Sequence, residues 1–257
     1  MVTALVFDCD GVLADTERHG HLPAFNATFE RFGLPARWSE DEYAAKLRIG
    51  GGKERMASLF EDPAFAAAVG DADRAELLLT WHRAKTAEFR RLVEQGRIPA
   101  RPGIARIIPA ALDDGWTVAV ASTSAEESVR AVLEHAVGPH AAARIPVFAG
   151  DVVPAKKPDP AIYRLTADRL GLHPRDTLVI EDSRNGLLAA TGAGFRCLVT
   201  VNGYTRHEEF GEAALVVSEL GDPGRPRVEV LANRSGARPG AYLTLGDLRA
   251  CMGGGPG

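Results

Sequence analysis

The sequence predicts an α/β protein with a doubly wound, parallel sheet and an all-helical insert after the first strand. Two observations favour this fold class. From about residue 98 onward, short apolar segments alternate with amphipathic ones, which is typical of parallel strands covered by helices on both faces. Residues 16–97, in contrast, contain no clear strand. We therefore expect a core domain of residues 1–15 and 98–218, a helical domain of residues 16–97 and a C-terminal extension of residues 219–257.

The predicted core elements follow one another in a regular order. The first strand covers residues 4–9, where the chain is apolar up to its first carboxylate. The later predicted strands are 116–122, 145–150, 177–182 and 196–203, and the predicted helices are 104–115, 124–136, 160–171 and 185–194. In the C-terminal extension, an edge strand at 227–232 and a short helix at 244–252 are expected to pack on the core, and 253–257 to fray.

The helical insert is predicted from apolar spacing and from residues that start helices. Phe25, Phe29 and Phe32 recur at helical spacing, so they share one face of a helix that Gly33 ends. Ser39 is a suitable N-cap for the next helix. The helices predicted in the insert are 22–33, 39–47, 51–60 and 73–96.

Composition restricts the classes of function. The 257 residues are 46% hydrophobic and 25% charged, which is ordinary for a soluble globular protein. A net charge of -4 without a dense basic block argues against nucleic-acid and membrane partners. Cys9, Cys197 and Cys251 lack the spacing of a disulfide framework or a metal site, and the N-terminus does not resemble a signal peptide. We expect a cytoplasmic monomer that acts on a small molecule.

Polar side chains follow the predicted strands at their carboxyl ends, where ligands bind in open α/β sheets. The residues concerned are Asp8 and Asp10 after the first strand, Ser122, Thr123 and Ser124 after the second, Lys157 after the third, and Glu181 and Asp182 at the end of the fourth. Carboxylates gathered at one edge repel one another unless a cation lies among them. Mg²⁺ prefers such oxygen ligands and is therefore the expected cofactor.

This set of residues suits phosphoryl transfer. Asp8 can attack phosphorus and form an aspartyl phosphate. Asp10, two residues on, can protonate the leaving alkoxide and later accept a proton from the attacking water. Lys157 and the Ser122 hydroxyl, together with Mg²⁺, would neutralise charge on the transferred group.

The same residues resemble a known family. "DCDGVLADT", Ser122, "KKPDP" and "IEDS" are similar, in order, to the four motifs of the haloacid dehalogenase (HAD) superfamily. A helical insert directly after the first motif resembles the C1 cap of the β-phosphoglucomutase-like branch, on a HAD Rossmann-like core. The resemblance implies that Asp8 is the nucleophile and Asp10 the acid/base. It also implies that Mg²⁺ is held by Asp8, Asp182 and the Asp10 backbone carbonyl, with Glu181 acting through a water.

A closer resemblance covers almost the whole chain. "DTERHGH", "IGGGKERM" and "GAYLTLGDLR" are similar to segments of the CbbY-like sugar-bisphosphate phosphatases. That resemblance implies a phosphatase acting on xylulose 1,5-bisphosphate, with ribulose 1,5-bisphosphate as a further substrate. The substrate-binding residues that it implies are Glu17, His21, Gly51, Gly52, Lys53, Arg55, Ser122, Thr123, Ser124 and Lys157. Lys53 and Arg55 would form a second anion site on the cap.

Alternatives remain at this stage for single residues. Ser124 and Glu127 match a capping box, so Ser124 could serve only to start a helix. Glu17 could equally be a helix-start acid and His21 a structural histidine. The segment that contains Lys53 could be a turn followed by a solvated helix start.

Alternatives also remain for the function. The first is a β-phosphoglucomutase-like sugar-phosphate mutase, and another is a non-catalytic binding module on the same fold. Dehalogenation is disfavoured because it needs neither Asp10 nor a metal. Phosphonate hydrolysis would need a Schiff-base lysine in the cap, for which Lys46 and Lys53 are candidates.

Overall fold

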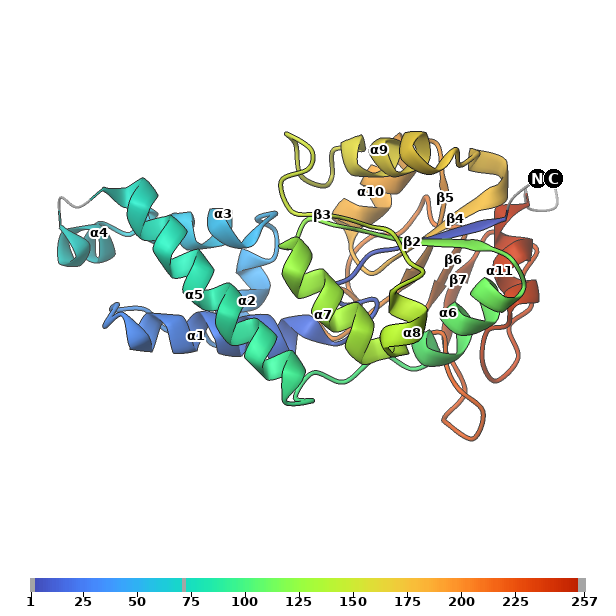
Figure 1. Cartoon of the computed structure of the whole chain (residues 1–257), viewed down its shortest axis with the longest axis horizontal. Coiled ribbons are helices and arrows are strands. Elements are labelled where there is room, and N and C mark those ends of the chain that lie inside the picture. Colours follow the sequence, from blue (N-terminus) through green and yellow to red (C-terminus); the bar gives the residue numbers. More distant parts are fainter. Residues whose placement is uncertain (1–2, 71–72, 254–257) are drawn as a thin grey trace. The chain divides into compact units, whose positions relative to one another are not determined.

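The computed structural model describes residues 3–70 and 73–253. The chain divides into two compact units, one formed by Met1–Ala14 with Ala100–Gly257 and the other by Asp15–Pro99. The first unit contains the sheet, and the second is built from helices (Figure 1).

The sheet of the first unit has seven strands in the order β3-β2-β1-β4-β5-β6-β7. The strands are β1 (Ala4–Phe7), β2 (Thr117–Ser122), β3 (Val147–Ala149), β4 (Thr177–Glu181), β5 (Arg196–Thr200), β6 (Leu215–Val217) and β7 (Val230–Asn233). All neighbouring pairs are parallel except β6 and β7, which are antiparallel. The predicted doubly wound parallel sheet is confirmed, and the tail supplies its edge strand.

Helices cover both faces of this sheet. They are α6 (Ile104–Asp113), α7 (Glu126–Val137), α8 (Pro139–Ala142), α9 (Ala161–Leu170), the short turn η3 (Pro174–Asp176), α10 (Arg184–Gly192) and α11 (Leu245–Met252). Figure 1 shows α9 and α10 on one face and α6, α7 and α8 on the other, where α11 also packs beside α6. Because both faces are covered, the central strands are buried and almost purely apolar.

The second unit consists of η1 (Glu17–His21), α1 (Leu22–Arg31), α2 (Glu40–Lys46), α3 (Gly52–Ala57), η2 (Ser58–Glu61), α4 (Pro63–Val69) and α5 (Arg74–Glu94). Helices α1 and α3 both pack against the long helix α5. The predicted N-cap Ser39 is confirmed, since it forms a capping box with Glu42 at the start of α2. Phe25 and Phe29 are fully buried, whereas Phe32 is 36% exposed because the helix has already ended there.

Two predicted details of the secondary structure are wrong, and a third is not tested. The first strand ends at Phe7 rather than at residue 9, because the chain turns at Cys9, whose carbonyl accepts from the amides of Val12 and Leu13. Helices α4 and α8 are not predicted, although each begins with a proline at a position that favours helix starts. The frayed end predicted at 253–257 lies outside the described residues except for Gly253.

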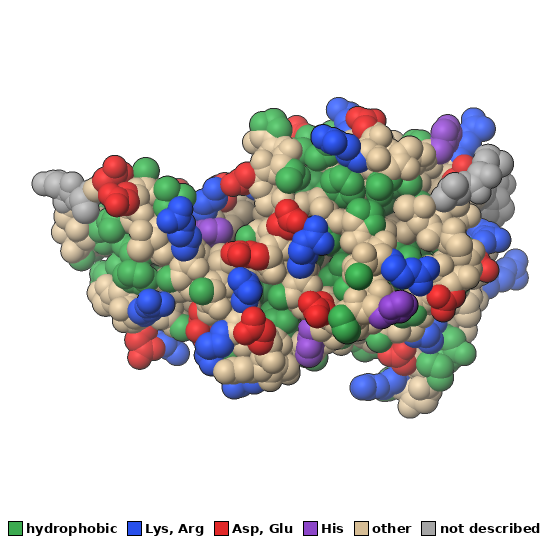
Figure 2. All heavy atoms as spheres, in the orientation of Figure 1, with side chains coloured by type: hydrophobic (Ala, Val, Ile, Leu, Met, Phe, Trp, Pro, Cys, Tyr) green, Lys and Arg blue, Asp and Glu red, His purple; other side chains and the backbone are tan. Residues whose placement is uncertain are grey.

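Acidic and basic side chains are intermixed on the face of the molecule that Figure 2 shows. Among the described residues, no helix combines the length and apolar character needed to cross a membrane. Cys9, Cys197 and Cys251 are buried, and no disulfide joins them.

Candidate active site

The strand β1 delivers Asp8 to the carboxyl edge of the sheet. The Asp8 amide still donates to the Ile180 carbonyl on β4 at 2.9 Å, so the nucleophile candidate is fixed by the sheet. The chain then turns sharply at Gly11, whose φ of +74° favours glycine. A Cβ on Gly11 would also lie 2.1 Å from Oδ2 of Asp182. This glycine therefore permits both the turn and the close approach of Asp182.

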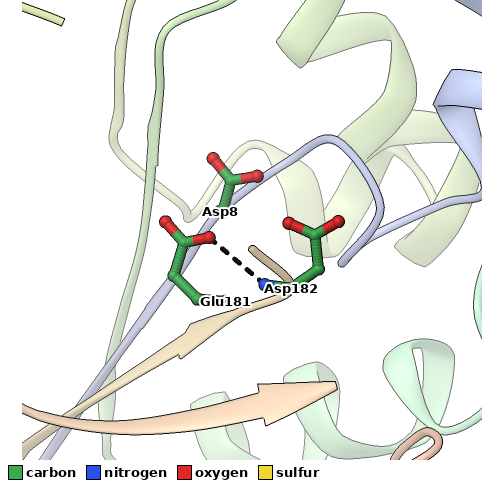
Figure 3. A group of neighbouring side chains, drawn as sticks. All are labelled: Asp8, Glu181 and Asp182. Atoms are coloured by element: carbon green, nitrogen blue, oxygen red, sulfur yellow. Dashed lines mark hydrogen bonds between the residues drawn. The ribbon is translucent and has the colours of Figure 1, made fainter. Parts of the chain in front are cut away.

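Three carboxylates converge beyond the ends of β1 and β4 (Figure 3). Asp8, Glu181 and Asp182 are all buried, and each offers an oxygen within 4.8 Å of the others. The Asp182 backbone amide donates to Oε2 of Glu181 at 3.2 Å, which holds the Glu181 carboxylate next to Asp182. Buried acids at this spacing can hold a divalent metal ion, because a hard cation binds oxygen ligands and offsets their repulsion.

Lys157 lies against two of these acids. Its ammonium donates to Oδ1 of Asp8 at 2.6 Å, to Oε1 of Glu181 at 2.7 Å and to the Ala121 carbonyl at 3.0 Å. The bond to Ala121 attaches the lysine to β2, next to Ser122. Lys157 therefore joins the ends of β1, β2 and β4 in one polar network.

Burial and neighbouring charges shift the pKa values of Asp8 and Lys157 in this network. Burial raises the pKa of Asp8 to about 8, since Lys157 only partly offsets the desolvation, and Glu181 and Asp10 raise it further. Burial alone would lower the pKa of Lys157, but the charges of Asp8 and Glu181 hold it above its usual range. A cation among the carboxylates would favour the charged form of Asp8, which is the form that attacks phosphorus.

The Ser124 hydroxyl donates to Oδ2 of Asp10. The interpretation of Ser124 as a helix cap is therefore wrong, since α7 has Ala125 as its N-cap and no side-chain cap. The Ser124 amide donates to Oγ of the buried Ser122 at 3.2 Å, and Thr123 lies half-buried between them. The loop after β2 thus brings a hydroxyl to the acid/base candidate.

Asn202, which follows β5, is a site residue that the sequence did not indicate. Its amide nitrogen donates to Oδ2 of Asp182 at 2.6 Å. Its side-chain oxygen accepts from the amides of Tyr204 at 2.8 Å and Thr205 at 3.2 Å, which fixes the orientation of the amide group. Asn202 therefore helps to fix the position of the Asp182 carboxylate.

The other predicted site residues lie in the helical unit. Glu17 is buried and accepts from the hydroxyl of Tyr43, and its Oε2 lies 3.5 Å from the guanidinium of Arg55. Arg55 also donates to the Tyr43 hydroxyl at 3.0 Å and to the Ile49 carbonyl at 3.0 Å. Glu17 and Arg55, 38 positions apart in the sequence, thus belong to one polar cluster that also contains Tyr43.

A second polar cluster in this unit surrounds His21. The ring stacks on Phe89 with centroids 4.2 Å apart, and its Nδ1 lies 2.7 Å from the ammonium of the buried Lys85. Lys85 also lies over the ring of Phe25, 4.7 Å from its centroid, and is another residue that the sequence did not single out. Lys85 lies four residues after Trp81 and four before Phe89, so its place on the buried face of α5 is the signal that could have identified it.

Gly51, Gly52 and Lys53 lie at the start of α3. Gly51 has a φ of +95°, so glycine is favoured there by the backbone conformation. A Cβ on Gly52 would lie 3.2 Å from Nε2 of His82, so the absence of a side chain allows this close approach. Lys53 is half-buried. These residues belong to the helical unit, as do Glu17, His21 and Arg55.

Carboxylates and a lysine gathered at the carboxyl edge of a doubly wound sheet are typical of hydrolases that transfer a phosphoryl group to an aspartate. A family model described as haloacid dehalogenase-like hydrolase matches residues 2–194, and the chain belongs to that family. The chain is therefore an enzyme, and its similarity to CbbY proteins identifies it as a phosphatase of the CbbY-like type.

The similarity to CbbY proteins extends over most of the chain. A "CBBY-like protein" of Arabidopsis thaliana is 46% identical over 230 residues, which is 89% of this chain and 72% of that protein. The crystal structure of CbbY from Rhodobacter sphaeroides in complex with phosphate is 41% identical, covers 87% of this chain and 97% of that one, and has a TM-score of 0.78. A mutant of CbbY from Rhodobacter sphaeroides in complex with xylulose-(1,5)bisphosphate is 40% identical with the same coverage and a TM-score of 0.77.

Proposed function

We propose that this protein is a Mg²⁺-dependent phosphatase that hydrolyses xylulose 1,5-bisphosphate through an aspartyl phosphate on Asp8. The observation that carries the proposal is the complex of a 40% identical relative with that bisphosphate. The geometry of the sheet edge supports it independently, because a buried carboxylate, a lysine and an acid/base candidate meet there.

The donor set at the sheet edge fits Mg²⁺. Asp8, Glu181 and Asp182 supply only carboxylate oxygens, without the nitrogen or sulfur atoms that favour softer metals. The side chains of Asp8 and Asp182, together with the Asp10 carbonyl, would hold the ion, and Glu181 would act through a water. When bound, Mg²⁺ supplies positive charge beside the transferring phosphoryl group and keeps Asp8 ionised.

The first half of the reaction transfers the phosphoryl group to Asp8. An oxygen of Asp8 forms a bond to phosphorus while the bond from phosphorus to the sugar oxygen breaks. Asp10 gives its proton to that sugar oxygen, so the product leaves as an alcohol. Lys157, now 2.6 Å from Asp8, would donate to the phosphoryl oxygens, and the Ser122 hydroxyl would do the same.

The second half returns Asp8 to its free form. The carboxylate of Asp10 accepts a proton from water as the water oxygen attacks phosphorus, and the bond from phosphorus to Asp8 breaks. The hydrogen bond from Ser124 would orient the Asp10 carboxylate in both halves. A mutase would use the same intermediate but return the phosphoryl group to a sugar hydroxyl.

A bisphosphate requires a second anion site, and we assign it to the helical unit. Lys53, half-buried at the start of α3, and Arg55 would supply its positive charge. In this proposal Glu17 and His21 would contact the sugar. Arg55, which donates to the Tyr43 hydroxyl and lies 3.5 Å from Glu17, would also hold Glu17 in place.

The test is a panel of phosphate esters assayed for released inorganic phosphate. It contains xylulose 1,5-bisphosphate, ribulose 1,5-bisphosphate, β-glucose 1-phosphate and p-nitrophenyl phosphate. We expect the highest kcat/KM for xylulose 1,5-bisphosphate. EDTA should abolish phosphate release, and added Mg²⁺ should restore it.

Different results would contradict different parts of the proposal. An isomerised sugar phosphate that accumulates without phosphate release would identify a mutase. A preference for a monophosphate would leave the phosphatase in place but reject the bisphosphate substrate. Full activity in EDTA would reject the metal-dependent mechanism.

Replacing Lys53 by alanine tests the second anion site. Loss of one charge-assisted phosphate contact should lower kcat/KM for xylulose 1,5-bisphosphate by about 10- to 150-fold. Hydrolysis of p-nitrophenyl phosphate, which has no second phosphate, should stay close to that of the unchanged protein. Both rates are measured by phosphate release at saturating Mg²⁺.

Arg37→Ala is the matched control for Lys53→Ala. Arg37 is exposed in the same unit, so this variant also removes one positive charge from it. The Arg37 variant should hydrolyse both substrates at the rates of the unchanged protein. Equal losses on both substrates in the Lys53 variant would show that the lysine supports the fold rather than the substrate.

A further inference from the structure

Tyr163 on α9 is a buried side chain that contacts two groups of the active site. The residue is 1% exposed, and its hydroxyl donates to Oε1 of Glu181. Its ring lies under the ammonium of Lys157, with Nζ 4.9 Å from the ring centroid. Tyr163 therefore contacts both partners of an ion pair at the edge of the sheet.

The carboxylate of Glu181 is confined on several sides. Its Oε1 accepts from Tyr163 and from Lys157, and its Oε2 accepts from the Asp182 amide at 3.2 Å. A Cβ on Gly186 would lie 1.9 Å from the carboxyl carbon, so the acid occupies the space that this glycine leaves. A buried carboxylate needs such donors, because an unpaired charge in the interior is costly.

Lys157 alone cannot supply the hydrogen bonds that the Glu181 carboxylate needs throughout the reaction. Its ammonium is shared between Glu181 at 2.7 Å and Asp8 at 2.6 Å. Once a phosphoryl group is on Asp8, that ammonium has additional anionic oxygens to bind, and its bond to Glu181 weakens. The Tyr163 hydroxyl is a neutral donor whose position does not depend on the state of Asp8.

We propose that Tyr163 is a positioning residue for the metal cluster. Its hydroxyl holds Glu181 facing Asp8 and Asp182, and its ring keeps Lys157 directed at Asp8. This inference rests on the proposed function, since it takes Glu181 and Asp182 to be part of the metal site. Partners of this kind, which orient a ligand from outside, typically change metal affinity by about 10- to 100-fold when they are removed.

The test is direct Mn²⁺ binding to the full chain without substrate, measured by calorimetry. Tyr163→Phe keeps the ring under Lys157 and removes only the hydroxyl, and it should raise the Mn²⁺ Kd by about 10- to 100-fold. Thr166→Val is the matched control on α9, because it removes another buried hydroxyl, which donates to the Ile162 carbonyl at 2.8 Å and lies in the same helix. The control should keep the Kd of the unchanged protein, whatever its effect on Tm.

A double-mutant cycle with Glu181→Gln tests whether Tyr163 changes Mn²⁺ affinity through its hydrogen bond to Glu181. If Tyr163 acts through Glu181, Tyr163→Phe should add no further loss of Mn²⁺ affinity in the Glu181→Gln background. Additive losses would overturn the inference. The cycle also serves if Tyr163→Phe alone folds poorly, because glutamine removes the buried charge that the hydroxyl satisfies.

Asp182→Ala separates failure of this inference from failure of the proposed function. If Asp182→Ala weakens Mn²⁺ binding and Tyr163→Phe leaves it unchanged, the positioning role of Tyr163 is wrong and the metal site stands. If Asp182→Ala binds Mn²⁺ as the unchanged protein does, the proposed metal site is wrong, and this inference is overturned with it.

Discussion

Replacing Asp8 by asparagine is expected to reduce turnover on the order of 10⁴-fold or more, because a carboxamide cannot form the aspartyl phosphate. The change is nearly isosteric, and the backbone bond from Asp8 to Ile180 on β4 is kept. The loss should appear in kcat for every phosphate ester, since all of them share the first step. Phosphate release from p-nitrophenyl phosphate at saturating Mg²⁺ measures it.

The stability of the Asp8→Asn variant separates lost chemistry from lost folding. Burial and neighbouring acids raise the pKa of Asp8 from 3.8 to about 8, so between these pH values the folded chain binds more protons than the unfolded chain. The free energy of unfolding contributed by this group therefore falls as pH rises through that window. In EDTA at pH 8, the asparagine variant should have a Tm at or above that of the unchanged protein.

Two outcomes would contradict the role of Asp8. The first is a variant that retains turnover within the normal range. The second is a phosphoenzyme that forms equally well in the variant, detected as a mass increase after a rapid acid quench. Either result would place the covalent intermediate on another residue or remove it from the reaction.

The parts of the site that the sequence predicted are those fixed by the ends of strands. Asp8 and the pair Glu181 and Asp182 each follow an apolar run, so parallel strands bring them to one edge whatever lies between them. Lys157 could be predicted because its motif is short and specific. For such residues, local sequence and sheet topology together are sufficient.

The residues that the sequence missed are defined by partners far away in the chain. Asn202 follows β5 but reaches Asp182 across the sheet edge, and Tyr163 has the appearance of an ordinary core residue on α9 until its hydroxyl is placed on Glu181. Ser124 was predicted as a substrate-binding residue by resemblance, but a helix cap stayed open as an alternative because its local pattern fits one equally well. In that case the tertiary contact with Asp10 outweighed the local preference.

The length of each sequence pattern decided which parts of the fold could be predicted. The alternation of strands and helices along the chain and the helical insert follow from patterns that extend over many residues, whereas α4 and α8 are too short for periodicity to reveal. Phe32 shows the opposite error, in which a pattern extends beyond its element: its spacing continues the apolar face of α1 after the helix itself has ended. Element type is thus better determined by the sequence than element ends.

Asp10→Asn is expected to slow turnover by about 10²- to 10⁴-fold, the usual contribution of a general acid or base. The loss should depend on the leaving group, which distinguishes Asp10 from Asp8. A sugar alkoxide needs a proton as it leaves, so hydrolysis of xylulose 1,5-bisphosphate should lose the most. p-Nitrophenolate leaves without protonation, so the first step with p-nitrophenyl phosphate should be less affected.

The second step should then limit the Asp10→Asn variant. Water attack on the aspartyl phosphate still lacks its base, so p-nitrophenyl phosphate should give a burst of p-nitrophenolate and an accumulated phosphoenzyme. Rapid-mixing absorbance measures the burst, and mass spectrometry after a quench measures the intermediate. Ser124→Ala, which removes only the hydrogen bond to Asp10, is the graded control and should cost about tenfold. An equal loss on both substrates with no burst would show that Asp10 supports the site without moving a proton.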